Sequence, residues 1–177
     1  MDMLAVFRAL RGKGTGKHRT KSKKSKKRKQ EEVEYFHTYC GVQKPAFGNH
    51  YHWSFVIWHG SYEQFEVVRT SEDGPWEPNM SMEVPKTSGC FALTSLADLP
   101  TYLLEDLYSI IQAVEVKQTA TWNSQDYVKA IWDGMYSYGM IGQDLYEEGR
   151  TSMMFYHGEV NPEVVAAAEA AGRVDEE

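Results

Sequence analysis

A segregation of charge divides this chain of 177 residues into two parts with different physical prospects. Residues 1–29 contain twelve Lys or Arg and a single acid, Asp2, which gives this stretch a net charge of +11. The remainder of the chain has a net charge of −17. Residues 11–31 are poor in apolar side chains, so burial cannot offset the chain entropy that folding removes. We therefore predict a largely disordered basic arm at residues 1–31, followed by an acidic folded body.

The arm ends in a dense cationic cluster, KKSKKRK at residues 23–29. Such a cluster is typical of a nuclear-import signal or a nucleic-acid contact, and the alternative is a solvated tail that only aids solubility. The acidic body should repel polyanions, so the arm is the part expected to meet importin or nucleic acid. The contact residues predicted on this basis are Lys23, Lys24, Lys26, Lys27, Arg28 and Lys29.

The chain carries no sequence signal for secretion or for a membrane span. Cys40 and Cys90 are too few for a disulfide framework. The basic residues near the N-terminus follow the short apolar run instead of preceding it, and no run of about 18 apolar residues occurs. We expect an intracellular protein, nuclear or cytoplasmic, with no transmembrane segment.

Hydrophobic periodicity predicts an α+β body at residues 32–160, with a small antiparallel sheet packed against helices. Alternating and β-branched stretches indicate strands, and apolar residues at helical spacing indicate helices. A long Pro- and Gly-containing loop, with room for one short edge strand, occupies 71–89, and residues 143–158 carry no clear period. A short helix from Pro162 belongs to an acidic tail, 161–177. The strands are expected at 33–40, 51–58, 62–70 and 90–96, and the main helices at 100–114 and 123–138.

Two short motifs carry the chemistry that the body suggests. His52 and Trp53 enter a buried strand, YHWSFVIW, and Trp122-Asn123-Ser124-Gln125-Asp126-Tyr127-Val128 opens a helix. The first turn of a helix has free N–H groups and a positive dipole end, which stabilise an anionic side chain. A His on a neighbouring strand can then serve as a base for a nucleophile placed there.

These motifs resemble those of circularly permuted papain-like proteins, the NlpC/P60-like class that includes the lecithin:retinol acyltransferase-like branch. The second motif is similar to Trp-Asn-Cys-Gln-Asp-Trp-Val, found in a set of uncharacterised fungal proteins. The resemblance covers about residues 33–142 and implies a papain-like cleft. It also implies His52 and Ser124 as the catalytic pair, in a vestigial or low-activity form, and ligand contacts by Trp53, Asn123, Gln125 and Asp126.

Position 124 departs from the family pattern, because Ser124 stands where the motif has Cys. A helix N-terminus contributes only about 0.3–1 kcal/mol at exposed sites, far too little to ionise a hydroxyl near neutral pH. Ser124 could act only with a well-placed general base. The residue that would orient His52 stays open between Gln64 and Glu66.

Structural explanations compete with these functional ones. His52 could be a hydrogen-bonded core histidine, Ser124 could be a helix N-cap, and Asp126 could simply suit the helix dipole. The remaining His and Cys spacings match no zinc pattern, so no metal and no cofactor are predicted.

Three functions follow from this reading of the sequence. We expect first a non-catalytic papain-like domain that binds a protein or small-molecule ligand. The alternatives are a serine-dependent hydrolase or acyltransferase using Ser124 and His52, and an adaptor whose activity resides in the arm.

Deleting residues 11–29 should abolish polyanion binding, because these residues hold most of the positive charge of the chain. The full chain should bind a DNA duplex with an affinity that falls steeply as salt rises from 50 to 200 mM, through counterion release. Fluorescence anisotropy at several salt concentrations measures both chains. Equal binding by the truncated chain would exclude the arm as the polyanion contact.

Overall fold

The computed structural model describes residues 33–86 and 89–171. The basic arm, with the contacts predicted for Lys23 to Lys29, lies outside these residues. The described body is an α+β domain, as predicted from the periodicity. It contains a five-stranded antiparallel sheet of order β4-β3-β2-β1-β5 and four α-helices. The strands are β1 (Tyr35–Gln43), β2 (His52–Trp58), β3 (Tyr62–Val68), β4 (Glu77–Ser81) and β5 (Cys90–Pro100).

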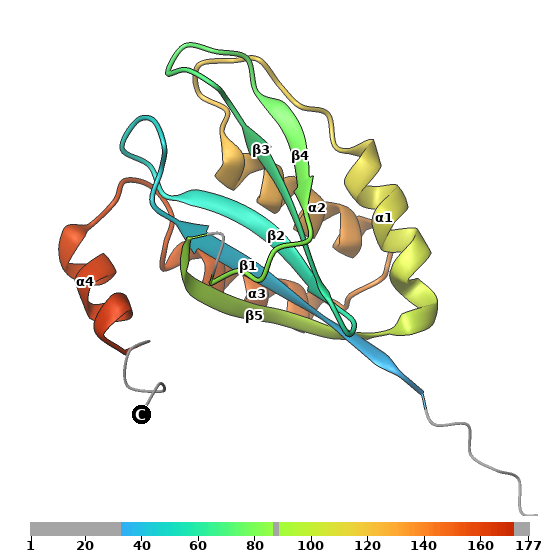
Figure 1. The fold of residues 1–177 in the computed structure, drawn as a ribbon. Helices are drawn as coiled ribbons and strands as arrows, with labels where there is room; N and C mark the ends of the chain where they lie inside the picture. The colour runs from blue at the N-terminus through green and yellow to red at the C-terminus, as the bar shows by residue number, and fades with distance from the viewer. Residues whose placement is uncertain (1–32, 87–88, 172–177) are drawn as a thin grey trace, which may run out of the picture. The chain divides into compact units, whose positions relative to one another are not determined.

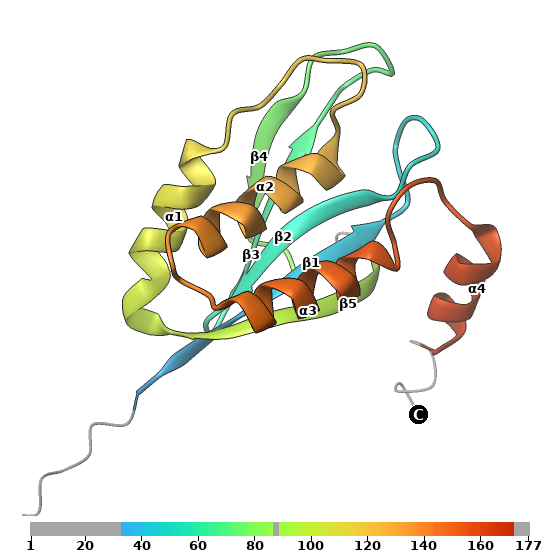
Figure 2. The same ribbon diagram turned by 180° about the vertical axis from the view of Figure 1, so that it is seen from behind.

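Helices cover one face of this sheet (Figure 2). α1 (Leu104–Ala113), α2 (Ser124–Ser137) and α3 (Gln143–Met154) follow the last strand, and α4 (Pro162–Ala171) ends the described chain. Alternate side chains of each central strand point toward the helices, as the two-residue period of a strand requires. On β1 and β2 these side chains are fully buried and form the centre of the core with α2: Phe36, Cys40, Val42, Trp53, Phe55, Ile57, Val128, Ile131 and Trp132.

The opposite face of the sheet is partly covered by the connection between β4 and β5. Its described part, residues 82–86, runs from the β4 edge in front of the central strands (Figure 1). Gln64 of β3 donates a hydrogen bond to the Glu83 carbonyl in this segment, with 3.0 Å between the atoms. Gln64 and Ser54 are therefore buried although they point away from the helices.

Several element boundaries differ from the periodicity-based predictions. β5 continues to Pro100, past the predicted end at 96, because Ala97 and Leu99 are buried and pair with Thr38 and Phe36 of β1. The predicted helix at 100–114 is accordingly shorter: a 3-10 turn occupies Thr101–Leu103 and α1 begins at Leu104. The edge strand expected within 71–89 is β4.

Residues 143–154 form α3, where the sequence showed no clear period. Gly149 and Met153 are its buried residues, and Gly149 lies against Trp132 of α2. A Cβ atom built at Gly149 would lie 2.4 Å from Trp132 Cζ2, so this contact requires glycine. The Trp132 indole donates to the Tyr146 carbonyl at 3.0 Å and completes the junction. This helix is therefore stabilised by tertiary contacts, which a search for hydrophobic periodicity does not detect.

α4 belongs to the same compact unit as the sheet, which spans Glu32–Glu177. Val165 is buried, and Lys44 pairs with Glu169 at 2.6 Å. The segment before α4 also pairs with the chain entering β2, since the Val160 amide donates to the Asn49 carbonyl at 2.7 Å. Among the described residues, none of the helices has both the length and the apolar character needed to cross a bilayer.

Gly149→Ala should destabilise the domain, because the added methyl group overlaps the Trp132 ring. Alanine favours a helix over glycine by about 1 kcal/mol, so we expect a net loss of about 1–3 kcal/mol in the free energy of unfolding. Urea denaturation measures it. Glu148→Ala, at the exposed neighbouring position of α3, is the control and should change stability by less than about 0.5 kcal/mol. Equal stability of the two variants would contradict the packing argument.

Candidate functional site

The first turn of α2 is built by Asn123 and Asp126. The Asn123 side-chain oxygen accepts a hydrogen bond from the Gln125 amide at 2.8 Å. The Asp126 carboxylate accepts one from the Asn123 amide at 3.2 Å, which completes a capping box. Asn123 is therefore the N-cap, and Ser124, which could have held this position, is the first helical residue.

The Ser124 hydroxyl links the start of α2 to strand β2. The hydroxyl oxygen accepts a hydrogen bond from the Trp53 backbone amide at 3.1 Å, and Ser124 is 2% exposed. In the described part of these strands, β2 pairs with β3 only from Phe55–Phe65 to Trp58–Tyr62. The start of α2 thus meets β2 just beyond the point where pairing with β3 ends.

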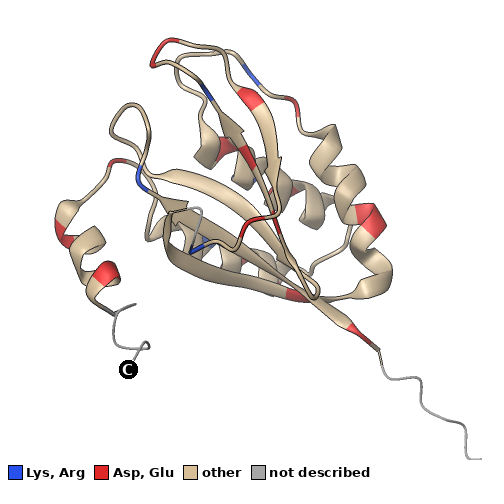
Figure 3. Ribbon diagram, viewed as in Figure 1, with Lys and Arg blue, Asp and Glu red and all other residues tan. Residues whose placement is uncertain are grey.

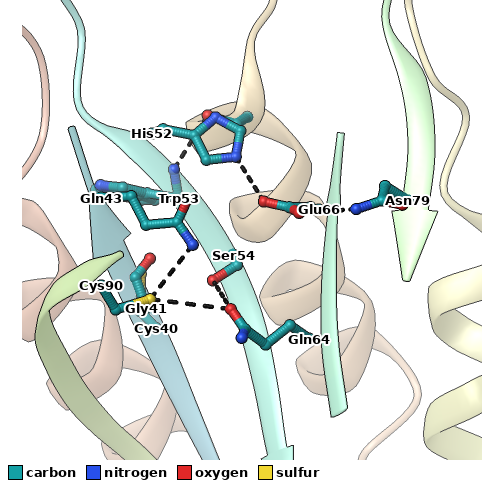
Figure 4. Close-up of polar contacts among 11 residues, drawn as sticks. Cys40, Gly41, Gln43, His52, Trp53, Ser54, Gln64, Glu66, Asn79 and Cys90 are labelled. Atoms are coloured by element: carbon teal, nitrogen blue, oxygen red, sulfur yellow. Dashed lines mark hydrogen bonds and ion pairs between the residues drawn. The ribbon is translucent and has the colours of Figure 1, made fainter. Parts of the chain in front are cut away.

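His52, Glu66 and Asn79 form a chain of hydrogen bonds across three strands, on the face away from the helices (Figure 4). His52 Nε2 donates to Glu66 Oε2 at 2.7 Å, and Asn79 Nδ2 donates to Glu66 Oε1 at 2.9 Å. Glu66, and not Gln64, therefore orients His52. Gln64 instead lies near Ser54 and Cys90, two strand positions away along β3 (Figure 4).

The two hydrogen bonds set the electrostatics of Glu66. Burial by itself would raise the pKa of this carboxyl group, whose side chain is 13% exposed. The hydrogen bond and the charge of His52, with the hydrogen bond from Asn79, outweigh burial and lower the pKa of Glu66 below its ordinary value. Glu66 is therefore a carboxylate at neutral pH.

Trp53 and Gln125, predicted as ligand contacts, are buried in this conformation and form hydrogen bonds to other segments of the chain. Trp53 is 0% exposed, and its indole donates to the Tyr156 carbonyl at 2.9 Å. Gln125 is 1% exposed; its amide nitrogen donates to the carbonyls of Tyr51 and Gly158, and its oxygen accepts from the Gly158 amide. These bonds hold the start of β2, the start of α2 and the segment after α3 together.

An open cleft of about 1180 Å³ lies over His52, Glu66 and Ser124. Three loops that are distant in the sequence form its walls: residues 43–51, 72–76 and 118–123. Gln118 ties two of them together, because its side chain donates to the Trp76 carbonyl at 2.7 Å and accepts from the Trp76 amide at 2.8 Å. Trp76 packs edge-on against Trp122, so the cleft has an aromatic wall.

Charge in the cleft is mixed, in a body where acidic side chains predominate (Figure 3). Lys44 and Arg69 line the cleft, as do Glu66, Glu72 and Asp73. The Arg69 guanidinium lies 4.9 Å from the centre of the Trp76 ring and donates to the Glu72 carbonyl. The cleft therefore offers cationic, anionic and aromatic contacts together, and its chemistry does not match a site for a simple polyanion.

His52 and Ser124 both line the cleft, but they do not contact each other through a hydrogen bond in the described structure. Because Nε2 of His52 donates to a carboxylate, Nδ1 is the nitrogen left to accept when the ring is neutral. The Ser124 oxygen already accepts the Trp53 amide. The site can therefore hold a ligand beside an oriented imidazole, whereas a poised serine–histidine pair is not formed.

Three members of this site were not identified from the sequence: Asn79, Trp76 and Gln118. All three lie in or beside segments that contain Pro or lack a period, so no pattern marked them. Their roles come from contacts with residues that lie 13 to 42 positions away along the chain. Within residues 33–86 and 89–171, no group of three or more His, Cys, Asp or Glu side chains gathers to hold a metal ion.

Comparison with known proteins yields no match, whether to protein-family models, to curated proteins or to solved structures. The site is therefore interpreted from its own geometry.

Glu66→Gln should lower the free energy of unfolding at neutral pH and make that free energy less sensitive to acid. A carboxyl whose folded pKa is lowered contributes stability above its unfolded pKa, about 4.3, and this contribution is lost as the pH falls through the folded value. We expect a loss of about 1–2 kcal/mol at pH 7 that shrinks toward pH 3. Urea denaturation from pH 7 to 3 measures it, with Glu77→Gln on the neighbouring strand as control. A loss that is the same at every pH would argue against an ionised Glu66.

Proposed function

We propose that this chain is a papain-like domain that binds a protein or small-molecule ligand in its cleft without covalent catalysis. The observation that carries the proposal is the state of Ser124. Its hydroxyl is buried, accepts the Trp53 amide and makes no hydrogen bond with His52 among the described residues. A serine in this state lacks the base that a nucleophilic hydroxyl needs.

The cleft itself supports binding. Its volume of about 1180 Å³ is ample for a small molecule or a short peptide segment. Trp76 and Trp122 supply an aromatic wall, and His52 and Arg69 supply polar contacts. Rigid aromatic surface combined with a few oriented polar groups is the usual composition of a ligand site.

A second function, serine-dependent hydrolysis or acyl transfer, is favoured by one specific observation. The chain from His52 through Glu66 to Asn79 would orient and support a general base in the way that a catalytic triad does. Hydrogen bonds between nucleophile and base are often long before a substrate binds, so on this alternative the pair would form only in the complex with substrate.

For the arm we propose a separate role in nuclear import or polyanion contact, through the cluster at residues 23–29. This role rests on charge alone. It is independent of the cleft, so both can operate in one protein.

Restoring a thiol at position 124 tests the proposal. In a Cys90→Ser background, Ser124→Cys should react with iodoacetamide at pH 7, because the helix N-terminus and His52 both favour the thiolate. Its rate should exceed that of Cys40 by about tenfold or more, since position 124 lines the cleft, whereas Cys40 lies in the core, where burial raises the pKa of its thiol. Mass spectrometry after timed labelling measures both rates. The same chain with Ser124 unchanged should form no adduct with a fluorophosphonate.

The added variant His52→Ala provides the matched control and should slow labelling of position 124. An unreactive thiol at 124 in a folded protein would mean that the cleft does not pair the two positions. A fluorophosphonate adduct on Ser124 of the natural chain would overturn the non-catalytic proposal and establish the serine-dependent alternative.

A further inference from the structure

Asn79 occupies a place in the cleft network that its sequence position does not suggest. It lies on β4, an edge strand that also contains Pro78, and it is the direct cross-strand partner of Glu66. Its side-chain amide donates to Glu66 Oε1 at 2.9 Å. Asn79 therefore does not reach the cleft itself but acts on the carboxylate that holds His52.

Glu66 is held by a donor at each oxygen. Asn79 contacts one oxygen and His52 contacts the other, at 2.9 and 2.7 Å. Two donors at opposite oxygens fix the rotation of the carboxylate about its terminal bond. Since a carboxylate only accepts hydrogen bonds, the atom of His52 that faces it must carry a proton.

The consequence for His52 is a defined tautomer. When the ring is neutral its proton lies on Nε2, and Nδ1 carries a lone pair. His52 lines the cleft, its side chain is 15% exposed, and in the described structure Nδ1 has no hydrogen-bond partner. Ser124, which lines the same part of the cleft, accepts the amide of the residue that follows His52.

We propose that Asn79 is a positioning residue that holds His52 with its proton on Nε2, so that Nδ1 offers the cleft a fixed hydrogen-bond acceptor. The cleft then selects ligands that present an O–H or N–H donor at this point. The tautomer half of this inference stands on the geometry of the described side chains. The ligand half rests on the proposed binding function.

Nitrogen-15 NMR of histidine-labelled protein tests the tautomer. At a pH where His52 is neutral, the natural chain should show His52 protonated on Nε2. Asn79→Ala frees the Glu66 carboxylate to rotate away from His52, so the ratio of the Nε2–H to the Nδ1–H tautomer should fall about fivefold, a change that corresponds to about 1 kcal/mol. Ser81→Ala, two residues along the same face of β4, is the matched control and should leave the ratio unchanged.

This readout separates positioning from a merely structural role, because a structural loss would change stability without moving the tautomer ratio. A natural chain with His52 protonated on Nδ1 would overturn the inference. So would an Asn79→Ala variant that is folded by circular dichroism and has the same ratio as Ser81→Ala.

Two matched fragments test the ligand class. Phenol carries an O–H donor and anisole replaces it with a methyl ether, so the two differ chiefly in hydrogen bonding. Phenol should shift the His52 ring nitrogen resonances and the Trp122 indole resonance, whereas anisole should shift only Trp122. If both shift Trp122 and affect His52 equally, the cleft binds ligands, as proposed for the function, but the assignment of Nδ1 as the selecting acceptor is wrong.

Discussion

The hydrogen bond from the Trp53 amide to the Ser124 hydroxyl joins the two layers of this domain at the point where its sheet opens. Pairing between β2 and β3 ends at Phe55 in the described structure, and the first turn of α2 meets β2 beyond it. A buried amide without a strand partner would cost free energy, and Ser124 supplies the acceptor. The position of His52, one residue before Trp53, follows from this junction, and so does the floor of the cleft.

The two faces of the sheet divide structure from chemistry. The face toward the helices is predominantly apolar and carries the core, while the opposite face carries the chain from His52 to Asn79. Polar side chains are tolerated on that face because it borders the cleft and because hydrogen-bond partners are available to them. There Glu66 keeps its charge through two donors, since burial alone would favour its neutral form.

Position 124 decides between two kinds of function on one scaffold. A thiol placed there would gain thiolate character from the helix N-terminus and from a nearby imidazole. A hydroxyl gains almost no anionic character there, because its pKa is too far from neutrality. In this chain the hydroxyl oxygen accepts a hydrogen bond from the Trp53 amide instead. The surrounding parts, an oriented His52 and an aromatic-walled cleft, remain suited to holding a ligand, which is why binding is the function we favour.

Local patterns in the sequence were enough to predict the acidic α+β body, most of its strands, and the helix that begins at position 124, because periodicity and capping act over a few residues. They could not separate Gln64 from Glu66, since the two share one face of β3 and only the spacing of β2 and β3 decides which reaches His52. Nor could they reveal Asn79 or the loops that form the walls of the cleft. The register of an edge strand places Asn79 opposite Glu66, and three loops far apart in the chain meet to enclose the cleft, so both exist only once the sheet is assembled.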